Sequence, residues 1–376
     1  MLFGSRMMQY HVVPFSLQLG LILLVVSRTI AFSPNSLSTK QGLSSLSSSS
    51  SILRANIFED FLSGVSKPTK TTKTPQVTIP KDFQIPEPKP LTITDDTDLI
   101  DFIKSSIAFA LRLGTGAFTL GWKIDSIFYN GDDEKYRLKL LGPLLSIRDS
   151  SSVLTEALSR PEKPLILYEY DGSPYCKRVR EMINLLDLNV EYRPCPGARQ
   201  SKFSNQLYER TGKRTVPYLI DPNTGTEMFE SNDQIEYLLQ TYGPPADLFD
   251  RKALWPITFE AFSIVTSTLV AIIRDMPSSK RQTNARPDNE DMIPIEIWGY
   301  ESSPFVRPVR EKLCSLCLPH IMISCSRGSA NRDKMTQKTG RFQVPYIVDP
   351  NTGIEMFESN EIVKYLDTVY TNTQGD

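Results

Sequence analysis

Serine, cysteine and basic residues come together in one short stretch of the sequence, "SPYCKR" at 173–178. A cysteine at the start of a helix and beside cations ionises easily, because the helix N-terminus and the positive charges stabilise the thiolate. Lys177 and Arg178 directly follow Cys176, so the stretch favours thiol chemistry at Cys176. The position three residues earlier holds Ser173, so no disulfide can form within this stretch.

The other cysteines are predicted to be structural. The chain has five cysteines, an odd and low number that does not fit the disulfide framework of a small secreted domain. Cys314 and Cys317 have the C-x-x-C spacing of a redox motif, but they lie two turns into a predicted helix, so buried packing roles are favoured. Cys195 and Cys325 fall near the ends of predicted strands, where packing roles are also expected.

Composition excludes several classes of function. His11 and His320 are the only two histidines, which excludes a histidine-dependent triad or a histidine-rich metal site, and no metal is expected. The formal net charge is −1, and no basic face of the kind that binds nucleic acid is evident. With 376 residues the chain is long enough for two or three domains.

An internal repeat determines how the chain is organised. The segment "LYEYDGSPYCKRVRE" at 167–181 matches "IWGYESSPFVRPVRE" at 297–311. Further on, "VPYLIDPNTGTEMFESNDQIEYLLQTY" at 216–242 matches "VPYIVDPNTGIEMFESNEIVKYLDTVY" at 344–370. Because the blocks keep the same order and nearly the same spacing, the sequence predicts two copies of one domain.

Each copy is predicted to have the element order βαβαββα, which makes the fold class α/β with tandem domains at 163–243 and 294–371. The "DPNTG" of each copy predicts a hairpin, because proline presets φ, asparagine tolerates the turn and glycine supplies a positive φ. Ser231 and Gln234 match a capping box at the start of the last helix, and Ser359 is predicted to cap the equivalent helix without that partner.

Both units resemble the thioredoxin-fold domain that glutaredoxins share with the N-terminal half of glutathione S-transferases. The resemblance rests on three motifs that occur in order in both copies: S-P-[YF]-x-x-x-V-R, V-P-Y, and the "ES" after the fourth strand. The helical C-terminal half of a transferase is not evident in the sequence. The chain as a whole resembles a tandem glutaredoxin-like family of plant and algal plastids.

The resemblance implies glutathione as the ligand, bound mainly through the protein backbone. It implies cis peptide bonds before two prolines, with the valine backbone pairing with the cysteinyl part of the tripeptide like an added strand. It also implies that the "ES" pairs receive the γ-glutamyl end, since a helix N-terminus favours an anion. The alternative is that each pair merely caps a helix. The implied glutathione-binding residues are Val216, Pro217, Glu230, Ser231, Val344, Pro345, Glu358 and Ser359.

The predicted reacting centre consists of Ser173, Cys176 and Ser303. In glutaredoxins the position of either serine holds the nucleophilic cysteine, and serine cannot form a mixed disulfide. In serine-type transferases a hydroxyl at this position favours the glutathione thiolate over the thiol. Cys176 occupies the resolving position, which in this fold usually points inward, and Val306 replaces it in the second unit.

Two functions therefore remain open. The first is a glutathione-dependent transferase or thiol oxidoreductase. The second is a non-catalytic module that uses two thioredoxin-like units as a binding scaffold. The loss of the nucleophilic cysteines favours the second function, and the retained serines favour the first.

The N-terminus predicts delivery to a plastid. The first 58 residues contain no Asp or Glu, and an apolar run at 15–26 has the length of a signal peptide. Residues 1–31 are interpreted as a signal peptide and 32–57, which are serine-rich, as a transit peptide. With Phe32 at the junction, the arrangement resembles the bipartite presequence of algae with complex plastids. The alternative is a secreted protein with a serine-rich linker.

Two further segments lie outside the repeats. Residues 58–162 are predicted to be a Pro/Lys-rich linker followed by one or two helices at 98–128. Residues 244–293 are predicted to be a helical linker with an apolar helix at 254–276. These apolar helices either pack on a sheet or form a surface for a protein partner or a membrane.

Overall fold

The computed structural model describes residues 83–87, 122–127, 137–139, 146–151, 158 and 160–372, apart from positions 198, 199, 246, 248, 290 and 302. The predicted presequence, residues 1–57, lies outside the described residues, as does most of the segment 58–162.

The first unit has the predicted order βαβαββα. Its first helix begins where the sequence suggests, because Ser173 accepts a hydrogen bond from the Cys176 N–H and Pro174 occupies the first turn. Val179, Met182 and Ile183 then bury one face of that helix. The elements are β4 (Leu165–Glu169), α5 (Pro174–Leu185), β5 (Val190–Pro194), α6 (Lys202–Thr211), β6 (Tyr218–Asp221), β7 (Thr226–Met228) and α7 (Ser231–Tyr242).

The second unit repeats this order, which confirms the duplication that the sequence predicts. Its first helix begins at Val306, two residues before Pro308, so that the proline lies in the first turn, where it is tolerated. The elements are β8 (Ile295–Gly299), α10 (Val306–Ser315), β9 (His320–Ser324), α11 (Asn331–Thr339), β10 (Tyr346–Asp349), β11 (Ile354–Phe357) and α12 (Ser359–Tyr370).

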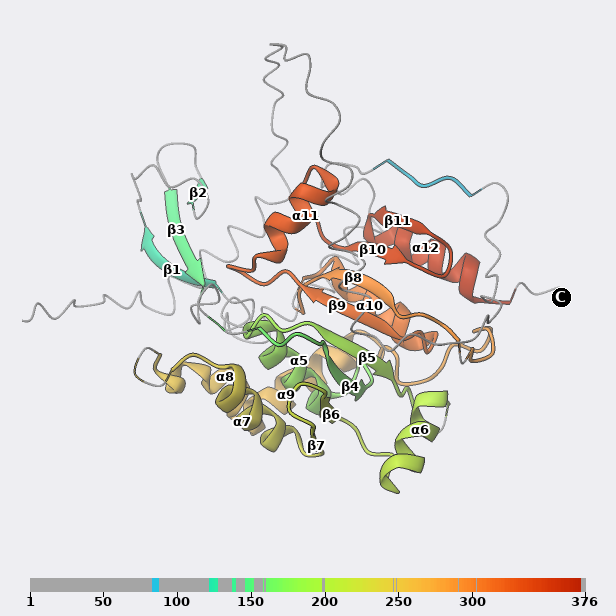
Figure 1. The fold of residues 1–376 in the computed structure, drawn as a ribbon, viewed down its shortest axis with the longest axis horizontal. Coiled ribbons are helices and arrows are strands. Elements are labelled where there is room, and N and C mark those ends of the chain that lie inside the picture. Colours follow the sequence, from blue (N-terminus) through green and yellow to red (C-terminus); the bar gives the residue numbers. More distant parts are fainter. Residues whose placement is uncertain are drawn as a thin grey trace, which may run out of the picture.

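One eight-stranded sheet runs through both units, in the order β11-β10-β8-β9-β5-β4-β6-β7 (Figure 1). The units meet where β5 pairs antiparallel with β9, with Val190 opposite Met322 and Tyr192 opposite His320. Within each unit the first two strands are parallel, and the remaining pairs are antiparallel. Because each unit uses an edge strand to cover the edge of the other, this junction leaves no unpaired strand edge.

The core divides into one large and two smaller apolar clusters. The large cluster includes buried side chains of α5 and α7 and of α10 and α12, so it continues from one unit to the other. The smaller clusters lie around Phe203 and Leu207 of α6 and around Met335 of α11. The helices α6 and α11 therefore pack in clusters separate from the one that the other four helices share.

The duplication extends to individual contacts at the hairpins. Asp221 accepts hydrogen bonds from the hydroxyls of Tyr237 (2.7 Å) and Tyr242 (2.5 Å). Asp349 accepts equivalent bonds from Tyr365 and Tyr370, both at 2.6 Å. Gly225 and Gly353, in the two turns, have the predicted positive φ, at 74° and 77° respectively. Each hairpin is thereby fixed to the last helix of its unit.

The linker between the units forms η2 (Arg251–Leu254), α8 (Trp255–Thr258) and α9 (Glu260–Ile273). One face of α9 packs against α5 through small side chains such as Ser263, Ser267 and Ala271. The other face exposes large apolar side chains, among them Val265 (57% exposed), Leu269 (44%) and Ile272 (56%). No single described helix is long and apolar enough to cross a bilayer, although the bent pair Arg251–Thr258 and Glu260–Ile273 reaches that length and composition together.

The segment before the repeats differs in part from the prediction. Residues 98–128 are predicted to be helical, but Trp122–Ile127 forms strand β1. It pairs with β3 (Ser146–Ser151), which also pairs with β2 (Arg137–Lys139), in a separate three-stranded sheet. Apolar Trp122 and Ile124 alternate with polar Lys123 and Asp125, and this period of two favours a strand rather than a helix. The rest of 98–128 lies outside the described residues.

Candidate functional site

Both predicted cis peptide bonds are present, at Val216-Pro217 and Val344-Pro345. In the first unit the cis-proline loop is bonded to α7. The Gln234 side-chain amide of α7 donates to the Pro217 carbonyl and to the Met228 carbonyl, both at 3.0 Å. Val216 and Val344 are half-buried, so part of each valine is accessible at the surface.

The Glu-Ser pairs lie at the turn from the fourth strand into the last helix. Glu230 and Glu358 adopt positive φ values of 62° and 73°, and the helices begin at Ser231 and Ser359. The predicted capping box is therefore wrong, since Ser231 is the first helical residue and the Gln234 side chain bonds to the loop instead. The positive φ of the glutamate turns the chain one residue earlier than the capping pattern suggests.

In the first unit Arg178 connects the motifs. Its Nη1 donates to Ser231 Oγ at 3.1 Å, and its Nη2 donates to Asn232 Oδ1 at 2.7 Å. Its Nε and Nη2 also donate to the Ile257 carbonyl of α8, each at 3.2 Å. The guanidinium is fully buried at the start of α7. Arg178 thus holds the first turn of α5, the start of α7 and α8 together.

The second unit joins the same motifs differently, because Pro308 stands where the first unit has Arg178. The Ser359 hydroxyl donates to the Phe305 carbonyl at 2.7 Å, between Ser303 and the start of α10. The Gln343 side chain donates to Glu358 Oε1 at 2.7 Å. A serine hydroxyl has one proton, so the proton of Ser359 is already engaged.

The two serines at the predicted reacting centre act as helix caps. Ser173 Oγ accepts from the Cys176 N–H at 3.2 Å, and Ser303 Oγ accepts from the Val306 N–H at 3.3 Å. Ser173 is 3% exposed and Ser303 is fully buried. Either hydroxyl can still donate a proton, but both serines are buried.

A tyrosine accompanies each of these serines, and sequence reasoning missed both. Burial raises the pKa of the Tyr170 phenol, whereas a side-chain hydrogen bond with Ser173 acts in the opposite direction. Burial likewise raises the pKa of Tyr300, and Ser303 opposes that effect in the same way. The signal was available, because both copies contain tyrosine three residues before the serine.

Cys176 points into the core, as this position usually does in the fold. It is fully buried, and burial, assisted by the charge of Glu169, raises the pKa of its thiol to about 12. The effect of burial therefore outweighs that of the basic neighbours, and the thiolate is not populated near neutral pH. The other four cysteines are free and buried as well, which confirms the packing roles predicted for Cys195, Cys314, Cys317 and Cys325.

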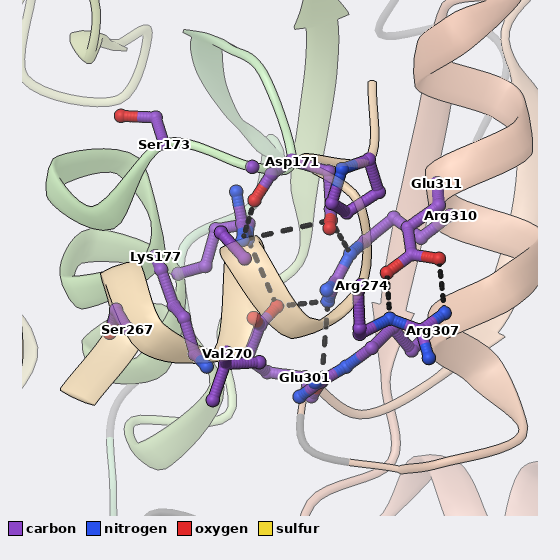
Figure 2. A pocket seen from close by; sticks show the side chains of 14 residues that line it. Asp171, Ser173, Lys177, Ser267, Val270, Arg274, Glu301, Arg307, Arg310 and Glu311 are labelled. Atoms are coloured by element: carbon purple, nitrogen blue, oxygen red, sulfur yellow. Dashed lines mark hydrogen bonds and ion pairs between the residues drawn. The ribbon is translucent and has the colours of Figure 1, made fainter. Parts of the chain in front are cut away.

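A charged pocket lies between the two units, and none of the predicted glutathione-binding residues lines it (Figure 2). Arg180 of α5 and Arg310 of α10 run through it, and each pairs with acidic residues of both units. Arg180 also pairs with the buried Glu169, and burial raises the pKa of that carboxyl to about 7. Ser173 lies at the margin of the pocket with its hydroxyl directed away from these ion pairs.

Comparison with known proteins supports the class of fold. The family model for the glutathione S-transferase N-terminal domain matches twice, at residues 167–246 and 298–374. The chain therefore carries two tandem glutathione S-transferase N-terminal domains of thioredoxin-like fold. No curated protein matches the chain.

One solved structure to which the chain is similar is described as "Leishmania TDR1 - a unique trimeric glutathione transferase". The identity is 14% over 57% of this chain and 70% of that one, and the TM-score of 0.21 is too low to indicate a common arrangement of the whole chains.

Proposed function

We propose that this protein binds glutathione through its first thioredoxin-like unit and does not use a protein thiol in redox chemistry. The observation that carries the proposal is the start of α7. There the Ser231 hydroxyl accepts from the buried Arg178 guanidinium at 3.1 Å, immediately after the positive-φ residue Glu230. Because Ser231 accepts in that bond, its own proton remains available for a carboxylate.

Three features at this point suit the γ-glutamyl end of glutathione, which carries one carboxylate and one ammonium group. Unpaired N–H groups and the helix dipole at the start of α7 favour the carboxylate. Arg178 adds a full positive charge next to the same hydroxyl. The exposed Glu230 side chain supplies the negative charge for the ammonium group.

The second unit has weaker support for binding. Its Ser359 hydroxyl already donates to the Phe305 carbonyl, and Gln343 already donates to Glu358. Pro308 replaces the arginine, so no cation occupies the position equivalent to Arg178. The proposal therefore predicts one bound glutathione per chain.

Calorimetric titration with reduced glutathione tests the proposal. Glu230→Gln should weaken binding at least about tenfold, since a charge-assisted hydrogen bond contributes roughly 1.5–3 kcal/mol. The matched control is Glu236→Gln, which changes an exposed carboxylate nearly two turns further along α7. No heat of binding for the unchanged protein, or equal affinities for both variants, would refute the proposal.

Between the two open functions, the buried cysteines and helix-capping serines favour a non-catalytic scaffold. A thiol oxidoreductase is disfavoured because Cys176 is fully buried and its pKa is raised to about 12. A transferase remains the second candidate, because the Ser173 hydroxyl keeps a proton that could stabilise a glutathione thiolate. The test is conjugation of glutathione to an electrophilic aryl halide. A higher rate in the unchanged protein than in a Ser173→Ala variant would establish the transferase.

For localisation we propose that residues 1–57 direct the protein into a plastid. The support is the apolar run, the Phe32 junction and the acid-free serine-rich stretch in the sequence. A fluorescent protein fused to residues 1–57 should enter the plastid stroma, and Phe32→Ala should prevent that entry. Unchanged import of the variant would contradict this assignment.

A further inference from the structure

The pocket between the units contains more basic than acidic side chains. It lies between α5, α9 and α10 and is closed on one side by the chain that follows α9, where Gly172 lies close to the Pro277 carbonyl. The basic side chains that line it are Lys177, Arg180, Arg274, Arg307 and Arg310, and the acidic ones are Asp171, Glu301 and Glu311.

The three acidic side chains are engaged with three of the arginines. Asp171 accepts from Arg310 Nε at 2.5 Å, and Glu301 accepts from Arg180 Nε at 3.1 Å. Glu311 accepts from Arg274 in a two-point ion pair, at 2.7 Å and 2.5 Å. These pairs account for the negative charge that lines the pocket.

Arg307 is different from these arginines. It is 4% exposed, and its Nε has no hydrogen-bond partner among the residues that the structure describes. Burial lowers the pKa of its guanidinium, and the neighbouring Arg310 acts in the same direction, although Glu311 opposes both. A buried donor on a charged group costs free energy unless an acceptor meets it. Since Arg307 lines the pocket, that acceptor can come from a ligand.

We propose that this pocket binds a small oxyanion, a phosphate or a carboxylate group, with the Arg307 guanidinium as its principal donor. Guanidinium groups match the geometry of both kinds of oxyanion through paired N–H donors. Lys177 lies on the opposite side of the pocket, on α5, and contributes a second positive charge (Figure 2). The bound anion bridges the two units and α9, so it stabilises their packing.

The test is thermal unfolding of the chain at constant ionic strength with increasing inorganic phosphate, and in a second series with succinate. The melting temperature should rise saturably with at least one of these ions, because a ligand of the native state stabilises it by mass action. The series that responds distinguishes phosphate from carboxylate.

Two arginine-to-methionine variants make the test specific. In Arg307→Met the anion should bind at least tenfold more weakly, while the anion-free protein should be at least as stable as the unchanged one, because a buried donor without an acceptor has been removed. In Arg341→Met, which changes an exposed arginine on another part of the second unit, the response to anions should be unchanged.

Two results would overturn the proposal: no saturable response in the unchanged protein, or an equal response in Arg307→Met. If Arg307→Met loses too much stability to be measured, Arg307→Gln takes its place, and an unchanged response in that variant would mean that Arg307 has a purely structural role. The Glu230→Gln variant should keep the full response to anions, so this pocket and the proposed glutathione site can fail independently.

Discussion

Arg310 of the second unit donates from Nε to Asp171 Oδ1 of the first unit at 2.5 Å, across the boundary between the two repeats. Arg180 and Glu301, at the equivalent repeat positions, form the reciprocal pair at 3.1 Å. The arginine of the V-R motif, which marks the family in the sequence, therefore holds the two copies together in this chain. A duplicated unit thus uses one motif twice to form a nearly symmetric interface.

Removing Arg310 should destabilise the protein strongly. All four of these side chains are at most 7% exposed, and breaking a buried ion pair by removing one partner costs about 3–5 kcal/mol, because the other charge is left uncompensated. Arg310→Met should lower the free energy of unfolding by this amount in a denaturant titration. The control is Lys364→Met, which breaks an exposed pair with Glu361 (3.0 Å) and should cost about 1 kcal/mol at most.

A double-mutant cycle identifies the partner. If Arg310 acts through Asp171, the double variant Asp171→Asn with Arg310→Met should lose less stability than the two single losses combined. Additive losses would mean that the 2.5 Å contact contributes nothing specific.

The cysteines should be unreactive in the folded protein. All five are free and buried, and burial raises the pKa of Cys176 and of Cys195 to about 12. Oxidised glutathione or an aromatic disulfide reagent at neutral pH should therefore modify the native chain only very slowly, and all five thiols should react in denaturant. Rapid modification of Cys176 in the native chain would contradict this prediction and would favour the thiol oxidoreductase as the function.

Much of the fold follows from the sequence because the duplication supplies an internal check. The order βαβαββα, the "DPNTG" hairpins and the cis bonds at Val216-Pro217 and Val344-Pro345 all appear in the structure. The hairpins have a local cause, the proline and glycine of the turn, which acts in the same way in both copies, whereas the cis bonds were expected from the family resemblance.

Features that depend on distant partners were not predicted. The start of α7 differs from the capping-box prediction because Glu230 takes a positive φ, which is uncommon for glutamate and depends on its surroundings. The pairing of β5 with β9 is also absent from the sequence prediction, since either edge strand could have faced solvent. The role of Arg178 depends on its contacts with α7 and α8, which lie far along the chain.

The stability of the protein should depend on pH through His320. This side chain is fully buried, its Nδ1 lies 2.9 Å from the Leu318 carbonyl, and burial lowers its pKa from 6.5 to about 4. Between these values the unfolded chain binds a proton that the folded chain does not. The contribution of neutral His320 is therefore complete above pH 6.5 and is lost progressively as the pH falls towards 4.

His320→Gln should remove this dependence. The stability difference between the variant and the unchanged protein should change by at most about 1.4 kcal/mol per pH unit in that range. Glu169, whose pKa is raised to about 7, acts in the opposite direction but is present in both proteins, so its effect cancels in the difference. A difference that stays constant between pH 6.5 and pH 4.5 would show that His320 titrates normally in the folded state.

The two helix-start serines should contribute unequally to glutathione binding. Ser231 accepts a hydrogen bond from Arg178 and keeps its proton, whereas Ser359 has already donated its proton to the Phe305 carbonyl. Ser231→Ala should therefore raise the dissociation constant of glutathione at least about tenfold, since a hydrogen bond to a charged group contributes roughly 1.5–3 kcal/mol. Ser359→Ala should leave the dissociation constant within about twofold. Each variant loses one internal hydrogen bond, so each serves as the stability control for the other.

Calorimetry should give one glutathione site per chain for the unchanged protein. Two equal sites, or equal effects of the two substitutions, would mean that the units bind alike and that Arg178 gives the first unit no advantage.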